Sequence, residues 1–195
     1  MLRQILFIIF ILFMGCTNPF DTRDPRLPET NNPIQPISNL QTNPDSLLRQ
    51  LQYAFQEPNW NYYDALLVDF SQFSIHFIFI PQQDAAFRLQ NWTRLDEENY
   101  FRKLIKDRGK DDLILQIYSV EGPVQIGASQ DTLQIQFKYQ IELNMLVEKE
   151  YYQGQSIFRI FRSTQSIWYI YYWEDIQLSA DKTDSTWSVL KATYR

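Results

Sequence analysis

Two residues in this sequence are candidates for a catalytic base. The chain has 1 His, His76, which lies in the apolar run 74–81, and 1 Cys, Cys16. His76 would be a base if it reached a substrate proton, and Asp69 would be one if apolar walls raised its pKa. The alternatives are a structural histidine held within the sheet and an aspartate that caps a loop. Asp69 and His76 are therefore the candidate catalytic residues, with no set of partners around either.

Other kinds of chemistry are excluded by composition and motif. One histidine and one cysteine are too few for a site built from several such ligands, and we predict no metal and no cofactor. The sequence has no Ser-His-Asp or Cys-His constellation, no P-loop and no dinucleotide fingerprint. The net charge of −5 argues against nucleic acid as a partner, because phosphates need a basic surface.

Aromatic residues form the second group with a possible binding role. They make up 16% of the chain, and aromatic walls with few polar groups suit an apolar ligand. We predict that five of them line the mouth of a cavity for a small apolar ligand: Trp92, Tyr100, Tyr139, Trp168 and Tyr172. The alternative is ordinary core packing, because aromatic residues favour strands in any case.

A further aromatic set lies on the opposite face of the last predicted strand. Tyr169, Tyr171 and Trp173 alternate with residues that face the core, so the period of two places them on the wet face. Exposed aromatic residues on a sheet face often mark a partner surface. We therefore predict that these three residues belong to a face that binds another protein.

The first residues carry a membrane-targeting pattern. One Arg precedes ten apolar residues, 5–14, and Gly15 and Cys16 follow. A transmembrane helix needs roughly 20 apolar residues, so this run has the length of a signal-peptide core. The sequence Phe13-Met14-Gly15-Cys16 resembles the lipobox of bacterial lipoprotein signals. The resemblance implies cleavage before Cys16 and a lipid on that cysteine, and the alternative is an ordinary signal peptide followed by a chance cysteine.

The residues after Cys16 predict a tether. Six of the nine prolines lie between residues 17 and 44, in a polar stretch that cannot bury enough apolar surface to fold. The predicted parts are a signal peptide, 1–15, a lipidated Cys and flexible Pro-rich tether, 16–43, and a folded domain, 44–195. The lipobox resemblance implies a membrane partner, reached through lipid on Cys16, in the bacterial cell envelope. Thr17 stands where some bacteria place an acid to retain lipoproteins at the inner membrane, which favours the outer membrane, facing the periplasm or the exterior.

Helical patterns and one strand open the folded domain. Asn43-Pro44 starts a helix with one apolar face, and Asn59 caps a second, short helix. Thr93 opens a third helix, which ends at Gly109. The apolar run 74–81 lies between the second and third helices and predicts a strand buried on both faces.

After the third helix the apolar period changes to two, which predicts half-buried strands. The clearest alternation runs from Leu133 to Met145. The strands predicted here are 113–117, 133–145, 156–162 and 166–178, with 153–155 after a turn and 187–194 as one closing helical turn. Helices followed by an antiparallel meander predict an α+β fold with the helices on one face of the sheet.

This order of elements resembles the nuclear-transport-factor-2-like superfamily, which includes ketosteroid isomerase and SnoaL-type polyketide cyclases. Residues 61–67 have the Asn–x–Tyr–x–x–Leu–Leu pattern of its second helix. Trp168-Tyr169-Ile170 with Trp173-Glu174-Asp175 looks like its closing strand, and the lipidated Cys, Pro-rich spacer and Thr186-Trp187-Ser188 look like bacterial lipoproteins of this type. The resemblance implies three N-terminal helices packed on a curved antiparallel sheet, a cystatin-like cone fold with a cavity. It also implies a homodimer through the sheet face and a catalytic aspartate near Asp69.

The sequence leaves three functions open. The favoured one is a non-enzymatic, membrane-anchored binding or scaffold module of the envelope. The alternatives are an isomerase- or cyclase-like enzyme that uses Asp69 or His76, and a carrier for a small apolar ligand in the cone cavity. They differ in whether the cavity is open, and the sequence does not decide whether large inward side chains such as Phe137 and Trp168 fill it.

Overall fold

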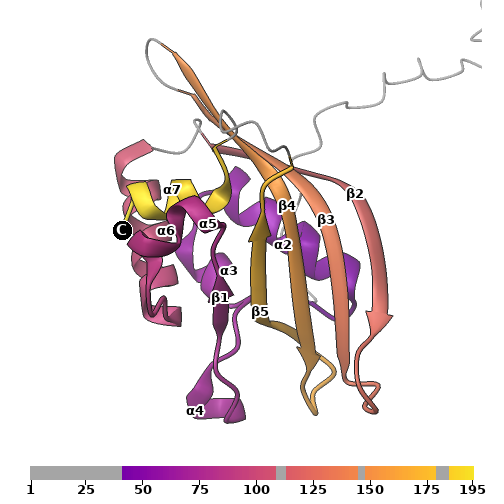
Figure 1. Cartoon of the computed structure of the whole chain (residues 1–195). Helices are drawn as coiled ribbons and strands as arrows, with labels where there is room; N and C mark the ends of the chain where they lie inside the picture. Colours follow the sequence, from indigo (N-terminus) through magenta and orange to yellow (C-terminus); the bar gives the residue numbers. More distant parts are fainter. Residues whose placement is uncertain (1–40, 109–112, 145–147, 179–184) are drawn as a thin grey trace, which may run out of the picture. The chain divides into compact units, whose positions relative to one another are not determined.

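The computed structural model describes residues 41–108, 113–144, 148–178 and 185–195. The predicted signal peptide, Cys16 and all but the last three residues of the predicted tether lie outside the described residues. Within the described part, helices gather on one side of a curved sheet of five strands (Figure 1). The predicted α+β class, with helices packed on a curved sheet, is confirmed.

The main helices begin at the capping residues that the sequence indicates. Helix α2 spans Pro44–Gln56, and its capping box joins Asn43 and Ser46: Ser46 N donates to Asn43 Oδ1 (2.8 Å) and Asn43 N donates to Ser46 Oγ (3.1 Å). Helix α3 spans Trp60–Asp64, and α6 spans Arg94–Arg108. Three short helices come between them in the chain: α4 at Phe70–Phe73, α5 at Gln83–Ala86 and η1 at Phe87–Leu89.

Four long strands form the antiparallel part of the sheet. They are β2 at Leu113–Gln125, β3 at Thr132–Asn144, β4 at Lys149–Arg162 and β5 at Trp168–Ile176. The strand order is β1-β5-β4-β3-β2. The alternation predicted for β3 is observed: Ile135, Phe137 and Tyr139 are buried, whereas Gln134 and Gln136 on the outer face are not. The helices therefore cover the inner face of the sheet.

Strand β4 is longer than the sequence pattern predicts. It begins at Lys149, so residues 153–155 lie inside the strand and not beside a turn. A Cβ on Gly154 would lie 2.5 Å from the hydroxyl oxygen of Tyr139 and 2.9 Å from the carbonyl oxygen of Ile176. Gly154 is needed for this close approach and not for a turn, two roles that a sequence alone does not separate.

The first strand differs most from its prediction. β1 covers only Ile78–Ile80, pairs parallel to β5 and lies at the edge of the sheet. Phe79 is buried, but Ile78 and Ile80 are 45% and 41% exposed, so the strand is not buried on both faces. The residues directly before it, 75–77, lie in neither a helix nor a strand, and α4 ends ahead of them at Ser74 in a left-handed conformation (φ 54°).

A β-bulge in β5 reverses the predicted orientation of two aromatic residues. Arg159 of β4 is opposite Tyr172, and Ile160 is opposite Ile170, which leaves Tyr171 as an extra residue in β5. One extra residue shifts the alternation by one position. Trp173, predicted on the exposed partner face, is consequently 0% exposed, and Tyr172, predicted in the cavity, lies half-buried on the outer face.

The helix that closes the chain is longer than the sequence predicts. Helix α7 spans Trp187–Thr193, two turns where one was predicted. Its residues Trp187, Leu190 and Lys191 are all fully buried. Figure 1 shows α7 beside α5 and α6, on the side of the sheet that carries the helices. This position makes α7 part of the interior of the domain.

Candidate functional site

The interior of the cone is filled by aromatic rings that meet around Trp187. Its ring packs edge-on against Trp173 (centroids 4.5 Å apart), Tyr139 (5.0 Å) and Phe55 (5.5 Å). All four residues are fully buried. Edge-to-face packing at these distances is the geometry that aromatic pairs prefer. Among the described residues, the middle of the cone is therefore occupied by side chains, and α7 supplies the central one.

A buried ion pair joins α7 to α6 beside these rings. Glu97 and Lys191 both have 0% exposed side chains, and Lys191 Nζ lies 2.8 Å from Glu97 Oε1 and 2.9 Å from Oε2. The carboxylate also accepts hydrogen bonds from Tyr63 Oη (2.5 Å) and Trp92 Nε1 (2.6 Å). The Lys191 ammonium lies 3.4 Å from the ring centroid of Trp173, a cation–π contact. Burial lowers the pKa of Lys191 to about 8, against the opposing attraction of Glu97.

A second buried carboxylate fixes the start of α7. Asp175 accepts hydrogen bonds from Tyr139 Oη (2.6 Å), Ser188 N (2.6 Å) and Ser188 Oγ (2.5 Å). The Tyr139 hydroxyl in turn accepts from Trp187 N (2.7 Å), and Trp187 Nε1 donates to Tyr100 Oη (3.0 Å). Burial holds the pKa of Tyr139 and of Tyr100 well above the ordinary value. Both hydroxyls stay protonated as members of a satisfied network, which is how buried polar groups are tolerated.

The five predicted cavity residues do not meet around an open space. Tyr100 and Tyr139 belong to the interior network, and Trp92 is bonded to Glu97 beside it. Trp168 is buried at the start of β5, and Tyr172 lies on the outer face with the Arg159 guanidinium 4.4 Å from its ring centroid. The sequence pattern did not predict that Glu97, Asp175 and Lys191 are buried and organise the interior, because charged residues are rarely buried.

The two predicted catalytic residues share a surface cleft but make no catalytic pair. Asp69 and His76 both line a cleft of about 360 Å³ near α4, and no hydrogen bond between them is present in the described part of the chain. Asp69 caps α4: its Oδ1 accepts from Ser71 N (2.9 Å) and Ser71 Oγ (2.8 Å). These bonds lower the pKa of Asp69, which weakens it as a base. The His76 ring stacks on the exposed Phe70, with centroids 4.1 Å apart.

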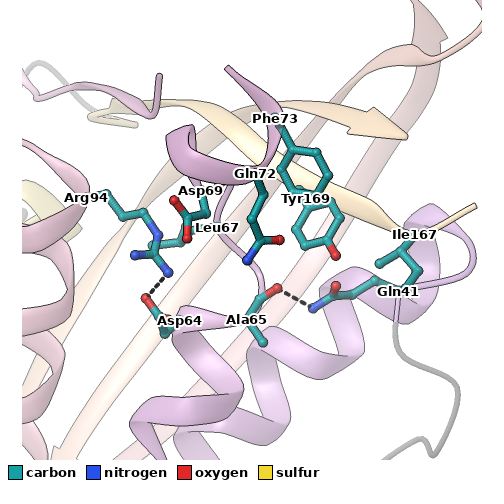
Figure 2. A pocket seen from close by; sticks show the side chains of 10 residues that line it. All are labelled: Gln41, Asp64, Ala65, Leu67, Asp69, Gln72, Phe73, Arg94, Ile167 and Tyr169. Atoms are coloured by element: carbon teal, nitrogen blue, oxygen red, sulfur yellow. Dashed lines mark hydrogen bonds and ion pairs between the residues drawn. The ribbon is translucent and has the colours of Figure 1, made fainter. Parts of the chain in front are cut away.

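A polar cleft of about 300 Å³, which we call the end cleft, adjoins this region. It lies where the end of α3, the start of α4, the start of α6 and the start of β5 come together (Figure 2). Its lining residues are Gln41, Asp64, Ala65, Leu67, Asp69, Gln72, Phe73, Arg94, Ile167 and Tyr169. Of these, Asp69 was predicted as a catalytic residue and Tyr169 as a residue of a partner face. The others come from five separate segments, so no local motif marks them.

The charges of the end cleft centre on Arg94. Its Nη2 lies 2.6 Å from Asp64 Oδ1, and Figure 2 shows Asp69 on its other side. The contact with Asp64 is an ion pair without hydrogen-bond geometry, since Asp64 Oδ1 and Arg94 Nε have no hydrogen-bond partner among the described residues. Burial raises the pKa of Asp64, and the attraction of Arg94 opposes this shift. The cleft therefore holds one charge pair and the additional carboxylate of Asp69.

The outer face of the sheet carries a group of tyrosines. Tyr169, Tyr171 and Tyr172 lie half-buried on β5, with Arg159 of β4 over the ring of Tyr172. The Tyr169 ring also packs against Phe73 of α4, with centroids 4.8 Å apart. Of the three residues predicted for a partner face, Tyr169 and Tyr171 lie half-buried on the outer face, whereas Trp173 is buried in the interior, and binding of a partner there stays a prediction.

Two features are absent from the residues that the structure describes. No helix in 41–108, 113–144, 148–178 or 185–195 is long and apolar enough to cross a membrane. In the same residues, no three or more His, Cys, Asp or Glu side chains are grouped in a way that could hold a metal ion.

Comparison with known proteins gives matches at the level of structure. No family model matches the sequence, and no curated protein matches it. A protein of unknown function from Mycobacterium tuberculosis matches with a TM-score of 0.50 at 9% identity, over 76% of this chain and 81% of that one. The β subunit of benzoate 1,2-dioxygenase from Burkholderia mallei matches with a TM-score of 0.51 at 14% identity, over 67% and 85%. A chain of naphthalene 1,2-dioxygenase matches with a TM-score of 0.53 at 8% identity, over 77% and 85%. At these identities the likeness shows a shared fold and carries no activity with it.

Proposed function

We propose that this chain, which has the cone-shaped fold of the nuclear-transport-factor-2-like superfamily, is a lipid-anchored protein of the bacterial envelope with a non-enzymatic binding or scaffold domain. The filled interior is the observation that carries the non-enzymatic part of this proposal, and the lipobox resemblance at Phe13-Met14-Gly15-Cys16 supports the anchor. Trp187 and Lys191 occupy the middle of the cone, and every polar atom named there has a hydrogen-bond or ion-pair partner. A partner would therefore bind to the exterior of the domain.

The two alternatives need features that the described residues do not supply. A carrier or an isomerase of this fold would hold an apolar ligand inside the cone, where the aromatic rings are already in contact. An enzyme would also need a base with a pKa near the working pH. The hydrogen bonds from Ser71 lower the pKa of Asp69, and His76 lies exposed against Phe70. The non-enzymatic function therefore fits the geometry best.

The anchor is tested by replacing its single attachment residue. In a bacterial host fed an alkyne-tagged fatty acid, we expect the full chain to carry the label and to sediment with outer membranes. The Cys16→Ser variant should lose the label and the membrane association, because several lipid chains are needed for stable anchoring and Cys16 is the sole cysteine. Thr17→Ser is the matched control and should behave like the original chain. Label on the Cys16→Ser variant, or none on the original chain, would contradict the anchor.

A scaffold role through the outer sheet face predicts a homodimer. A face that combines tyrosines with Arg159 has the composition enriched in protein interfaces. By sedimentation of the full chain in detergent, we expect a dimer, and we expect the Tyr171→Glu variant to be monomeric. Two-fold symmetry would bring the two new carboxylates close together in a desolvated interface.

The matched control for the dimer is Tyr118→Glu. Tyr118 lies on β2, away from β5, and is 41% exposed. This variant should remain dimeric, because the same change in charge then falls outside the proposed interface. A monomeric original chain, or a Tyr171→Glu variant that stays dimeric, would show that the outer face has no such role.

A further inference from the structure

The end cleft offers hydrogen-bonding groups that the protein itself does not use, and we propose that it binds a neutral sugar, a ring carrying neighbouring hydroxyl groups. This inference does not depend on the lipid anchor or on the dimer. It depends on three properties of the cleft: its unused donors and acceptors, its charge, and its aromatic wall.

The unused groups include both hydrogen-bond donors and hydrogen-bond acceptors. Among the described residues, the side-chain amide of Gln72 and the hydroxyl of Tyr169 make no hydrogen bond, and both residues line the end cleft. In Figure 2 the amide of Gln72 is drawn between Arg94 and Tyr169. An amide supplies two donor hydrogens and an acceptor, and a hydroxyl supplies one donor with acceptor lone pairs. Sugar hydroxyls each donate and accept, and two adjacent ones can bridge neighbouring groups of this type.

The charge of the cleft argues against a strongly charged ligand. Arg94 is already paired with Asp64 at 2.6 Å, so it has little net charge to offer a phosphate or carboxylate. The remaining charge is the carboxylate of Asp69, whose lowered pKa keeps it ionised and which would repel an anion. Its Oδ1 is engaged by Ser71, which leaves its second oxygen to accept from a ligand hydroxyl. A neutral ligand rich in hydroxyl groups fits this arrangement better than an anion does.

The wall and the size of the cleft limit the ligand further. The adjacent rings of Phe73 and Tyr169 form an apolar wall, against which the C–H groups of a sugar ring can pack. The volume of about 300 Å³ lies at the lower end of the range for ligand pockets. One or two sugar rings fit such a volume, so we expect a short saccharide or the end of a longer one.

The test uses the full chain in a detergent that has no sugar headgroup. Saturation-transfer NMR and calorimetry are run with glucose, galactose, N-acetylglucosamine and their disaccharides, and with inorganic phosphate as an anionic comparison. We expect at least one sugar to bind in the millimolar range and phosphate to bind more weakly. The Tyr169→Phe variant keeps the ring but loses the hydroxyl, and should weaken binding about fivefold, the value of one neutral hydrogen bond.

Two glutamine variants distinguish sugar binding in the end cleft from binding elsewhere on the surface. Gln72→Ala removes an exposed amide that has no described partner, so the variant should fold normally and bind at least about fivefold more weakly. Gln90→Ala makes the same change at an exposed residue outside the cleft and should leave the affinity unchanged. The proposal is overturned if no sugar of the panel binds, if phosphate binds more tightly than the sugars, or if Gln90→Ala weakens binding as much as Gln72→Ala.

Discussion

The Lys191→Met variant is expected to lose about 3–5 kcal/mol of unfolding free energy, the cost of breaking a buried ion pair from one side. Without Lys191, the fully buried Glu97 carboxylate keeps only the hydrogen bonds from Tyr63 and Trp92. Domains of this size are stable by about 5–15 kcal/mol, so the loss is a large fraction of the total. Equilibrium unfolding in urea, followed by tryptophan fluorescence, measures it as a shift in the midpoint.

Two further variants show that the loss comes from an uncompensated charge. The double variant Glu97→Gln/Lys191→Met removes both charges and should recover part of the stability, because the penalty for an unpaired carboxylate disappears. Lys106→Met makes the same change on an exposed residue of α6 and should leave the urea midpoint almost unchanged. A Lys191→Met variant as stable as Lys106→Met would mean that Glu97 does not need Lys191 as its counter-ion.

Local rules predicted the elements whose cause is local. The cap at Asn43 and the alternation along β3 depend on neighbouring residues, and both are observed where expected. The bulge at Tyr171 depends on how β5 pairs with β4, and its residue types carry no sign of the extra position. One unpredicted residue was sufficient to exchange the faces of Tyr172 and Trp173. Errors of this kind are expected wherever register is set by pairing between strands.

The interior was harder to predict because its key residues break the usual rule for burial. Lys191 lies in the short closing segment 187–194, and long charged residues are usually found in water. Its burial depends on Glu97, ninety-four positions earlier, and on the ring of Trp173. The aromatic residues predicted around a cavity are near the interior, but α7 fills the space between them. The sequence showed which residues were apolar, whereas the partners of the buried charges became visible only in the fold.

The end cleft shows the same limit for a surface site. From the sequence, Asp69 was predicted as a possible base. In the structure it caps α4 and lines the end cleft. Asp64, Gln72 and Arg94 have the side chains of ordinary exposed residues, and the turn between α3 and α4 and the start of α6 bring them together. The pairing of Arg94 with Asp64 and the unused hydrogen bonds of Gln72 depend on the fold, and a sequence does not show them.

The Trp187→Ala variant is expected to lose about 3–5 kcal/mol of stability and to open a cavity in the cone. Trp187 is fully buried among Phe55, Tyr139 and Trp173, so the removed ring leaves a hole lined mainly by aromatic groups. Apolar cavities made in this way stay dry and can bind small aromatic molecules. Added indole should therefore stabilise the variant, by about 1.4 kcal/mol at tenfold the Kd, and should leave the unaltered chain unchanged.

The matched control is Trp60→Ala, because Trp60 is only partly buried and lies under the Arg102 guanidinium at 3.4 Å from its ring centroid. Its loss leaves no enclosed hole, so indole should not rescue that variant. If Trp187→Ala is too unstable to study, Trp187→Leu leaves a smaller cavity and should show a smaller rescue. The decisive observation is the response of the unaltered chain to indole in thermal unfolding. A rise in its midpoint would mean that the cone binds ligand with Trp187 in place. The carrier function would then replace the proposed binding or scaffold function.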